Sequence, residues 1–257
     1  MATSYLSTRV TVATEQDAKK LDRVMKYLNN TRGAGLVLEG AGSLVVRAYI
    51  DAAHGVHEDG MGHQGLFVTL GMGLVMAKSR KQKVQCKSST ETELVALSDF
   101  VEQVKWVKDY LEAQGHKTGP ARVYQDNTST MAKVKQDSLS GKDRKKHFKK
   151  RRLLVKDSVD EKIVTLKYLP TEAMVADLLT KPLQGQLFKR LRMAMINCDD
   201  SLCGGVSVNM ISDIAKASNI INNVNNKESK NNNRIKPRQR QTATNRELGK
   251  SQFGKQR

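Results

Sequence analysis

The sequence of 257 residues has only three cysteines, lacks an apolar run as long as a membrane span, and lacks an apolar segment at its N-terminus. Cys86, Cys198 and Cys203 form neither a CxxC pair nor a zinc-binding pattern with the five histidines. A membrane-spanning helix needs about 20 apolar residues, and residues 1–10 have no signal-peptide core. These absences predict an intracellular protein with reduced cysteines and no membrane partner.

Positive charge is what the sequence has in excess, with a formal net charge of +18 at pH 7. Residues 142–156 contain nine Lys and Arg against one Asp, and residues 227–257 contain ten against two Glu. Charge concentrated in this way favours a polyanionic partner, most directly a nucleic acid. A solvated surface without a partner is the alternative, above all for the tail.

The apolar pattern predicts an α/β fold with a mixed sheet. After an amphipathic helix at 14–30, three consecutive strands expected to pair antiparallel lie at 44–51, 66–70 and 74–77. The elements expected to follow are a long helix at 91–114, a strand at 121–125, a helix at 127–136, a basic helix at 142–156, a strand at 163–168, and helices at 171–180 and 187–196. Beyond about residue 221 the composition shifts to Asn, Gln, Lys and Arg, which predicts disorder.

Four acidic residues lie where a site for divalent cations would need them, at strand ends and on helices: Asp51, Glu93, Asp126 and Asp177. Mg²⁺ prefers oxygen ligands, and phosphodiester cleavage with two such ions needs several acids together. Each acid also has an ordinary structural explanation. Asp51 could be a turn residue after a strand, Asp126 an N-cap, and Asp177 a solvated acid in the middle of a helix.

Glu93 is the most informative of the four. On a helical wheel it lies at the edge of the apolar stripe of its helix, whereas Glu91 points nearly the opposite way. The stripe consists of Leu94, Leu97, Val101, Val104 and Leu111. A carboxylate on a buried face is unfavourable unless it is paired or binds a cation. The alternative is a capping box between Thr90 and Glu93 at the start of the helix.

Three segments follow one another in an order and at a spacing that a known family shares. They read KSRKQKVQCKSSTETELVAL (78–97), VYQDNTSTM (123–131) and YLPTEAMVADLLTKPL (168–183), and ADLLTKPL is the most specific part. They resemble the ribonuclease H domain of copia-type LTR retrotransposon polyproteins. The segment AYIDAAH (48–54) of this chain matches the opening aspartate segment of that family. Residues 4–38 look like the end of the preceding reverse transcriptase region, so the resemblance covers residues 4–196.

The resemblance implies an RNase H-like fold, a mixed sheet of three antiparallel strands and then parallel strands, flanked by helices. It implies that the four acids form a tetrad that holds two Mg²⁺ ions, or Mn²⁺ instead, with Asp51 bridging both. The substrate implied is an RNA–DNA hybrid, cut in its RNA strand. The rest of a reverse transcriptase is a further expected partner, and no small-molecule cofactor is expected.

The basic segment is expected to contact phosphates. The candidate nucleic-acid-binding residues are Asn127, Lys142, Arg144, Lys145, Lys146, His147, Lys149, Lys150, Arg151 and Arg152. His147 could instead touch the scissile region, but a structural or backbone-contact role is favoured. The segment also has the composition of a nuclear localisation signal, which adds the nucleus to the expected cytoplasm. Trp106 and Tyr110 are expected to pack against the fold rather than stack on bases.

The sequence departs from the family in three places. Ala53-His54 follows the first aspartate, GHQG (62–65) replaces an RSTSG-like turn, and the basic segment around Lys146-His147 is far more charged than in the family. It has no YVDD-like polymerase motif and no protease or integrase signature. We expect a polyprotein fragment without polymerase activity, made of a reverse transcriptase tail (1–38), an RNase H-like domain (39–197) and a basic, Asn-rich, disordered tail (198–257). There are two competing hypotheses, an inactive nucleic-acid-binding remnant and a simple RNA-binding adaptor. Metal-dependent cleavage would distinguish a nuclease from both.

Overall fold

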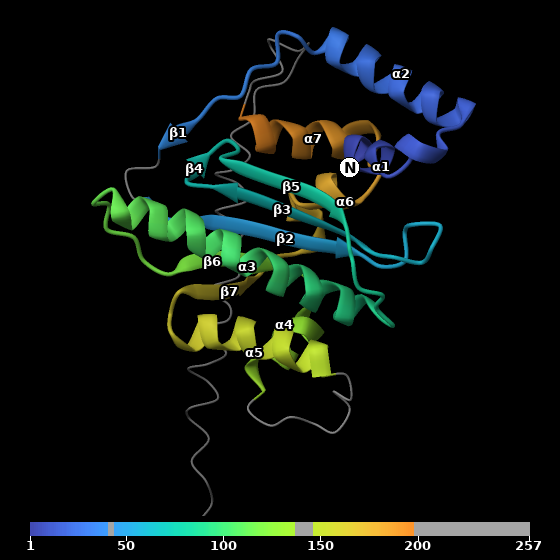
Figure 1. The fold of residues 1–257 in the computed structure, drawn as a ribbon. Coiled ribbons are helices and arrows are strands. Elements are labelled where there is room, and N and C mark those ends of the chain that lie inside the picture. The colour runs from blue at the N-terminus through green and yellow to red at the C-terminus, as the bar shows by residue number, and fades with distance from the viewer. Residues whose placement is uncertain (41–43, 137–145, 198–257) are drawn as a thin grey trace, which may run out of the picture. The chain divides into compact units, whose positions relative to one another are not determined.

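A five-stranded mixed sheet organises the computed structural model, which describes residues 1–40, 44–136 and 146–197 (Figure 1). Its strands are β2 (Arg47–Ala53), β3 (His63–Thr69), β5 (Met76–Lys81), β6 (Ala121–Gln125) and β7 (Val164–Tyr168), in the order β5-β3-β2-β6-β7. Strands β2, β3 and β5 pair antiparallel, whereas β6 is parallel to both β2 and β7. The predicted mixed sheet is therefore confirmed. A short antiparallel pair, β1 (Glu39–Gly40) with β4 (Gly71–Met72), was not predicted.

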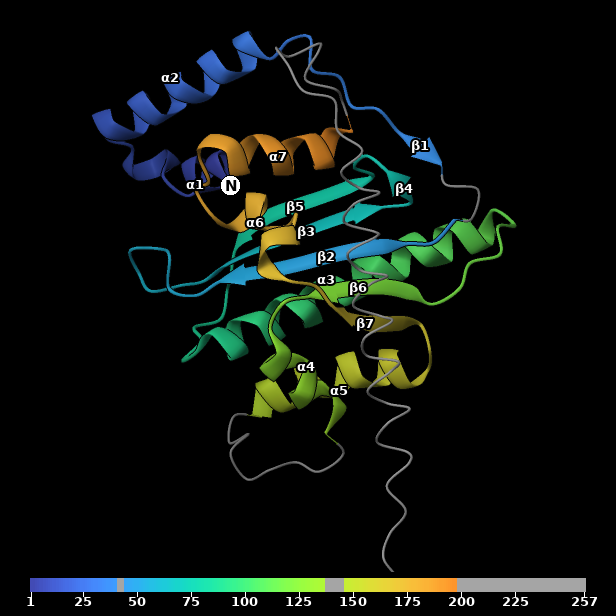
Figure 2. The same cartoon turned by 180° about the vertical axis from the view of Figure 1, so that it is seen from behind.

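Helices cover both faces of the sheet. They are α1 (Ala2–Ser7), α2 (Glu15–Asn30), α3 (Ser89–Ala113), α4 (Thr128–Lys135), α5 (Lys146–Asp160), α6 (Asp177–Thr180) and α7 (Gly185–Ile196), with 3-10 turns η1 (Val10–Val12) and η2 (Thr171–Ala173). Figures 1 and 2 show α3 against one face and α6 against the other. The expected helix at 171–180 is wrong in detail, because η2 and α6 are separate and residues 174–176 between them are not helical.

The alternation of side chains along β2 decides which face receives the first acid. Ala48, Ile50 and Ala52 belong to the core that includes the apolar stripe of α3. Tyr49 belongs to the second core, which includes α6 residues. Because successive residues of a strand point to opposite faces, Asp51 lies on the α6 side together with Tyr49.

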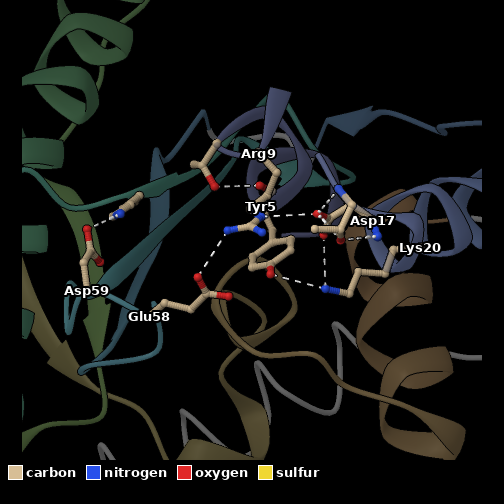
Figure 3. Close-up of polar contacts among 9 residues, drawn as sticks. Tyr5, Arg9, Asp17, Lys20, Glu58 and Asp59 are labelled. Carbon is tan, nitrogen blue, oxygen red and sulfur yellow. Dashed lines mark hydrogen bonds and ion pairs between the residues drawn. The ribbon is translucent and has the colours of Figure 1, made fainter. Parts of the chain in front are cut away.

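A network of polar contacts ties the N-terminal helices to the loop after β2 (Figure 3). The predicted helix at 14–30 is confirmed, and Thr14 with Asp17 forms its capping box. Asp17 also accepts a hydrogen bond from Arg9 and pairs with Lys20, while Arg9 reaches Glu58 in the loop. Hydrogen bonds from Thr14, followed by those from Arg9 and Lys20, lower the pKa of Asp17 to about 2 despite its burial. The boundary predicted at residue 38 stays a prediction.

Two sets of apolar side chains face outward. In α2, Leu21, Met25 and Leu28 are each more than half exposed, so its predicted apolar stripe does not join the described core. On α3, Trp106 and Tyr110 are 59% and 51% exposed and stack on each other with ring centroids 5.7 Å apart. The expectation that these two aromatic residues pack against the fold is wrong, because they lie opposite the buried stripe of the helix.

Several predictions concern segments that the structure does not describe. The disordered tail at 198–257 lies outside the described residues, as do Cys198 and Cys203, whereas Cys86 is buried in the core. In the described ranges, no helix has both the length and the apolar character needed to cross a bilayer.

Candidate metal centre

Three of the four predicted acids converge at one end of the sheet. One carboxylate oxygen from each of Asp51, Glu93 and Asp126 lies within 4.8 Å of the others, and we call these residues the carboxylate triad. Asp51 and Glu93 are buried and Asp126 is partly exposed. The site therefore combines two buried carboxylates with one that solvent can reach.

The topology explains why these side chains meet. β2 and β6 are parallel neighbours, so their carboxyl ends lie at the same edge, and Asp126 directly follows β6. Asn127, not Asp126, caps α4 by accepting a hydrogen bond from the Thr130 backbone N–H at 3.0 Å. The N-cap alternative for Asp126 is therefore wrong.

The start of α3 excludes the capping alternative for Glu93. The helix begins at Ser89 and is capped by Ser88, whose hydroxyl accepts from the Glu91 backbone N–H at 3.2 Å. Glu91 in turn accepts from the Lys87 backbone N–H at 2.7 Å. Ser88 and Glu91 thus make the capping contacts of α3, and the Glu93 carboxylate contributes to the triad.

Gln125 holds two members of the triad at once, and the sequence analysis did not identify it. Its side chain is fully buried, and its amide nitrogen donates to the Glu93 carboxylate at 3.0 Å. Its amide oxygen accepts from the Asp126 backbone N–H at 2.9 Å. A fully polar residue at the buried end of an apolar strand, next to a candidate ligand, was the available signal.

Replacing Gln125 with Met is expected to weaken divalent-cation binding by about 10- to 100-fold, the usual effect of losing a hydrogen bond that orients a ligand. Met keeps the volume of the side chain but supplies neither the donor for Glu93 nor the acceptor for Asp126. Calorimetric titration with Mn²⁺ measures the change. Gln114→Met, at the exposed end of α3, is the matched control. Equal affinity in Gln125→Met and wild type would contradict the role given to Gln125.

Asp177 lies beside the triad and is linked to it through its own helix. It is the first residue of α6 and 5% exposed, so both its predicted mid-helix position and the solvated alternative are wrong. Lys181 donates to its carboxylate at 2.7 Å and lies 3.8 Å from the Asp51 carboxylate. The Thr180 hydroxyl donates a hydrogen bond to the same Asp51 oxygen.

A chain of buried hydrogen bonds fixes α6 against the sheet. His57 Nε2 lies 3.0 Å from His63 Nδ1, and His63 Nε2 lies 2.9 Å from Ser79 Oγ. The Ser79 hydroxyl donates to the Leu179 carbonyl at 2.6 Å, so it accepts from His63. Gly65 permits the close approach, because a Cβ there would lie 2.7 Å from that of Leu179. Sequence reasoning found none of these residues, since the contacts join segments far apart in the chain.

The electrostatics of the site favour a cation. Burial, and then the charge of Asp51, raises the pKa of Glu93 well above its ordinary value. Burial is also the main cause that raises the pKa of Asp51, and Lys181 and Thr180 offset only part of it. Burial and the charge of Asp51 raise the pKa of Asp177 to about 6. Acids that repel one another in this way gain from a divalent ion, and an all-carboxylate donor set suits Mg²⁺ or Mn²⁺.

Comparisons with known proteins point in one direction. No family model matches the chain. It is 28% identical over 190 residues to the retrovirus-related Pol polyprotein from transposon RE1 of Arabidopsis thaliana, which covers 73% of this chain and 13% of the polyprotein. It is 28% identical over 209 residues to that from transposon RE2 of the same plant, which covers 80% of this chain and 14% of the polyprotein. Its homologues are retrovirus-related Pol polyproteins from transposons.

The resemblance to a retrotransposon polyprotein is thereby confirmed, for a chain that spans only 13% and 14% of the length of these two relatives. Among solved structures, RNase H1 from Halobacterium salinarum NRC-1 is similar with a TM-score of 0.40 and 15% identity, over 52% of this chain and 93% of that one. LC11-RNase H1 in complex with an RNA/DNA hybrid is similar with a TM-score of 0.40 and 14% identity, over 52% and 93%.

The predicted nucleic-acid-binding residues of the basic segment 142–156 divide into four groups. Lys146, His147 and Lys150 are exposed, and Lys149 is partly exposed. Arg151 is partly exposed but pairs with Asp99 and donates to Ser98. Lys142, Arg144 and Lys145 lie outside the described residues. Among the described residues of the segment, Lys146, Lys149 and Lys150 place their charge on the surface of α5.

The prediction that Arg152 binds nucleic acid is wrong, because this residue is 2% exposed and cannot reach a phosphate. Its guanidinium donates to the carbonyls of Lys133 and Gln136 at the end of α4, at 3.2 and 2.9 Å. The helical periodicity of α5 turns this residue inward together with Phe148 and Val155. Arg152 therefore joins α5 to α4.

Arg152→Met is expected to lower the free energy of unfolding by about 1–3 kcal/mol, since the carbonyls of Lys133 and Gln136 lose a charged donor. The salt dependence of nucleic-acid binding should not change, because Arg152 makes no phosphate contact. Lys150→Met, at an exposed position of the same helix, should show the reverse pattern. Urea denaturation and binding of a hybrid at several salt concentrations measure the two effects. A reduced salt slope in Arg152→Met, with unchanged stability, would contradict this assignment.

Proposed function

We propose that this chain is a metal-dependent endonuclease that hydrolyses the RNA strand of RNA–DNA hybrids. The observation that carries the proposal is the carboxylate triad, three oxygens within 4.8 Å of one another at the end of a mixed sheet. Homology to retrovirus-related Pol polyproteins supports a substrate that arises in reverse transcription. The exposed basic residues of α5 support a nucleic-acid partner.

The triad would hold the divalent ion, Mg²⁺ or Mn²⁺. The chemistry that such an ion would supply there is the activation of water for in-line attack and the stabilisation of the leaving 3′ oxygen. Gln125 keeps Glu93 and the Asp126 backbone in position. Thr171 donates to the Asp126 carboxylate at 2.8 Å and orients it. These contacts preorganise the carboxylates before the substrate arrives.

The substrate would approach from the side of Asp126, the partly exposed member of the triad. Asn127 lies next to it, and its side-chain oxygen caps α4 while its amide nitrogen can donate to a 2′-hydroxyl or a phosphate. α4 packs against α5, on which Lys146, His147 and Lys150 are exposed. We assign phosphate contacts to these three residues.

The test is cleavage of a hybrid labelled on its RNA strand, with Mg²⁺, with EDTA, and with the Asp126→Asn variant. Cleavage that needs the metal and is lost in the variant supports the proposal. Asp59→Asn, an exposed acid paired with Lys81, is the matched control and should cut normally. Tight, salt-sensitive binding without cleavage by wild type would instead support an inactive binding remnant.

A further inference from the structure

Lys181 places a positive charge within the acidic site itself. Its ammonium donates to the Asp177 carboxylate at 2.7 Å and lies 3.8 Å from the Asp51 carboxylate. The lysine is therefore a fixed cation that contacts one member of the carboxylate triad and the fourth predicted acid.

The local sequence builds this contact. Asp177 begins α6 and Lys181 is its C-cap residue, so the two side chains are one helical turn apart and lie on the same face. Lys181 has an extended backbone, as expected for a residue that precedes proline, here Pro182. Pro182 therefore restricts the backbone conformation from which the Lys181 side chain extends at the end of α6.

The pair differs from ordinary surface ion pairs of the same spacing. In the pairs of Lys26 with Asp22 and Lys156 with Asp160, the acid is 60% and 57% exposed. In the pair with Lys181, the Asp177 side chain is 7% exposed, and the Asp51 side chain is 2% exposed. A cation held by two buried carboxylates is harder to replace than one on the surface, where water screens the attraction.

We propose that the Lys181 ammonium takes the place of a second divalent cation between Asp51 and Asp177, so that the protein binds one such ion at the carboxylate triad and resists a second. The inference rests on the proposed function. It reduces the number of divalent ions bound from the two that the resemblance implied to one. A second ion that uses Asp177 must first displace the lysine.

The test is the binding of Mn²⁺ to the full chain, with free Mn²⁺ followed by electron paramagnetic resonance and affinities measured by calorimetry. We expect wild type to bind one ion tightly, and Asp51→Asn to lose it. In Lys181→Met a second ion should bind at least about tenfold more tightly than in wild type, because no charged donor has to be displaced. Lys181→Gln keeps a donor for Asp177 without the charge and provides a second test if Met impairs folding. Lys181→Arg, and Lys189→Met on the exposed side of α7, should resemble wild type.

The outcomes separate this inference from the proposed function. Two ions of similar affinity in wild type, or an unchanged second affinity in both Lys181→Met and Lys181→Gln, would overturn the inference and leave the metal site in place. Mn²⁺ binding that is the same in wild type and Asp51→Asn would overturn the metal site, and the inference with it.

Discussion

Asp51→Asn is expected to lower the rate of hybrid cleavage by at least about 1,000-fold, since a metal ion contributes several kcal/mol of transition-state stabilisation and each 1.36 kcal/mol is a factor of ten. Asp51 is the centre of the site, because it contributes to the carboxylate triad and has two further contacts. It accepts a hydrogen bond from Thr180 and forms an ion pair with Lys181. Asparagine has nearly the same shape but no negative charge. The loss should therefore come from the metal and not from the fold.

Single-turnover cleavage of a labelled hybrid at saturating enzyme measures the effect of Asp51→Asn, and circular dichroism checks that the variant is folded. The side-chain oxygen of asparagine can still accept from Thr180, so the position of α6 should be kept. Raising the Mg²⁺ concentration should recover little activity. Cleavage within tenfold of wild type would show that Asp51 does not hold the metal used in catalysis.

The second large effect is on the stability of the metal-free protein as a function of pH. The pKa of Asp177 is raised from 3.8 to about 6, mainly by burial and then by the charge of Asp51. A group with a raised folded-state pKa contributes its full stability below about pH 4, and this contribution is lost as the pH rises through about 6. The shift corresponds to about 3 kcal/mol, so the ionised carboxylate destabilises the metal-free fold at neutral pH.

Asp177→Asn is accordingly expected to be more stable than wild type at pH 8 in EDTA, by up to about 3 kcal/mol or on the order of 10 °C in the unfolding temperature. The difference should disappear near pH 4, where wild-type Asp177 is protonated. Thermal unfolding of both proteins between pH 4 and pH 8 measures the difference and removes effects that they share. A difference that grows toward low pH would contradict the buried, destabilising carboxylate.

What could be predicted from the sequence follows from how locally each feature is encoded. The strand at 121–125 was predicted at its observed bounds, because a short apolar run between Gly-Pro and an acid is a local signal. The helical wheel placed Glu93 at the edge of the apolar stripe but left the capping box open as an alternative, and the start of α3 at Ser89 excludes that alternative. The split of the region 171–180 into η2 and α6 was missed, since Met174, Val175 and Ala176 leave the helix in order to pack against the sheet.

Contacts between segments that are distant in the chain could not be predicted from the sequence. Gln125 and the chain from His57 through His63 and Ser79 to Leu179 depend on which strands are neighbours. Arg152 was assigned to nucleic acid by composition, yet one turn of helix decides whether a basic residue faces solvent or the core. Composition identified the charged segment, and the helix geometry decides which of its basic residues are exposed and which are buried.

The metal site is best tested by anomalous scattering from Mn²⁺ in crystals of the full chain with an RNA–DNA hybrid. We expect a peak bound by the carboxylates of Asp51, Glu93 and Asp126 and next to a phosphate of the RNA strand. Mn²⁺ bound at other residues, with these three carboxylates holding none, would contradict it.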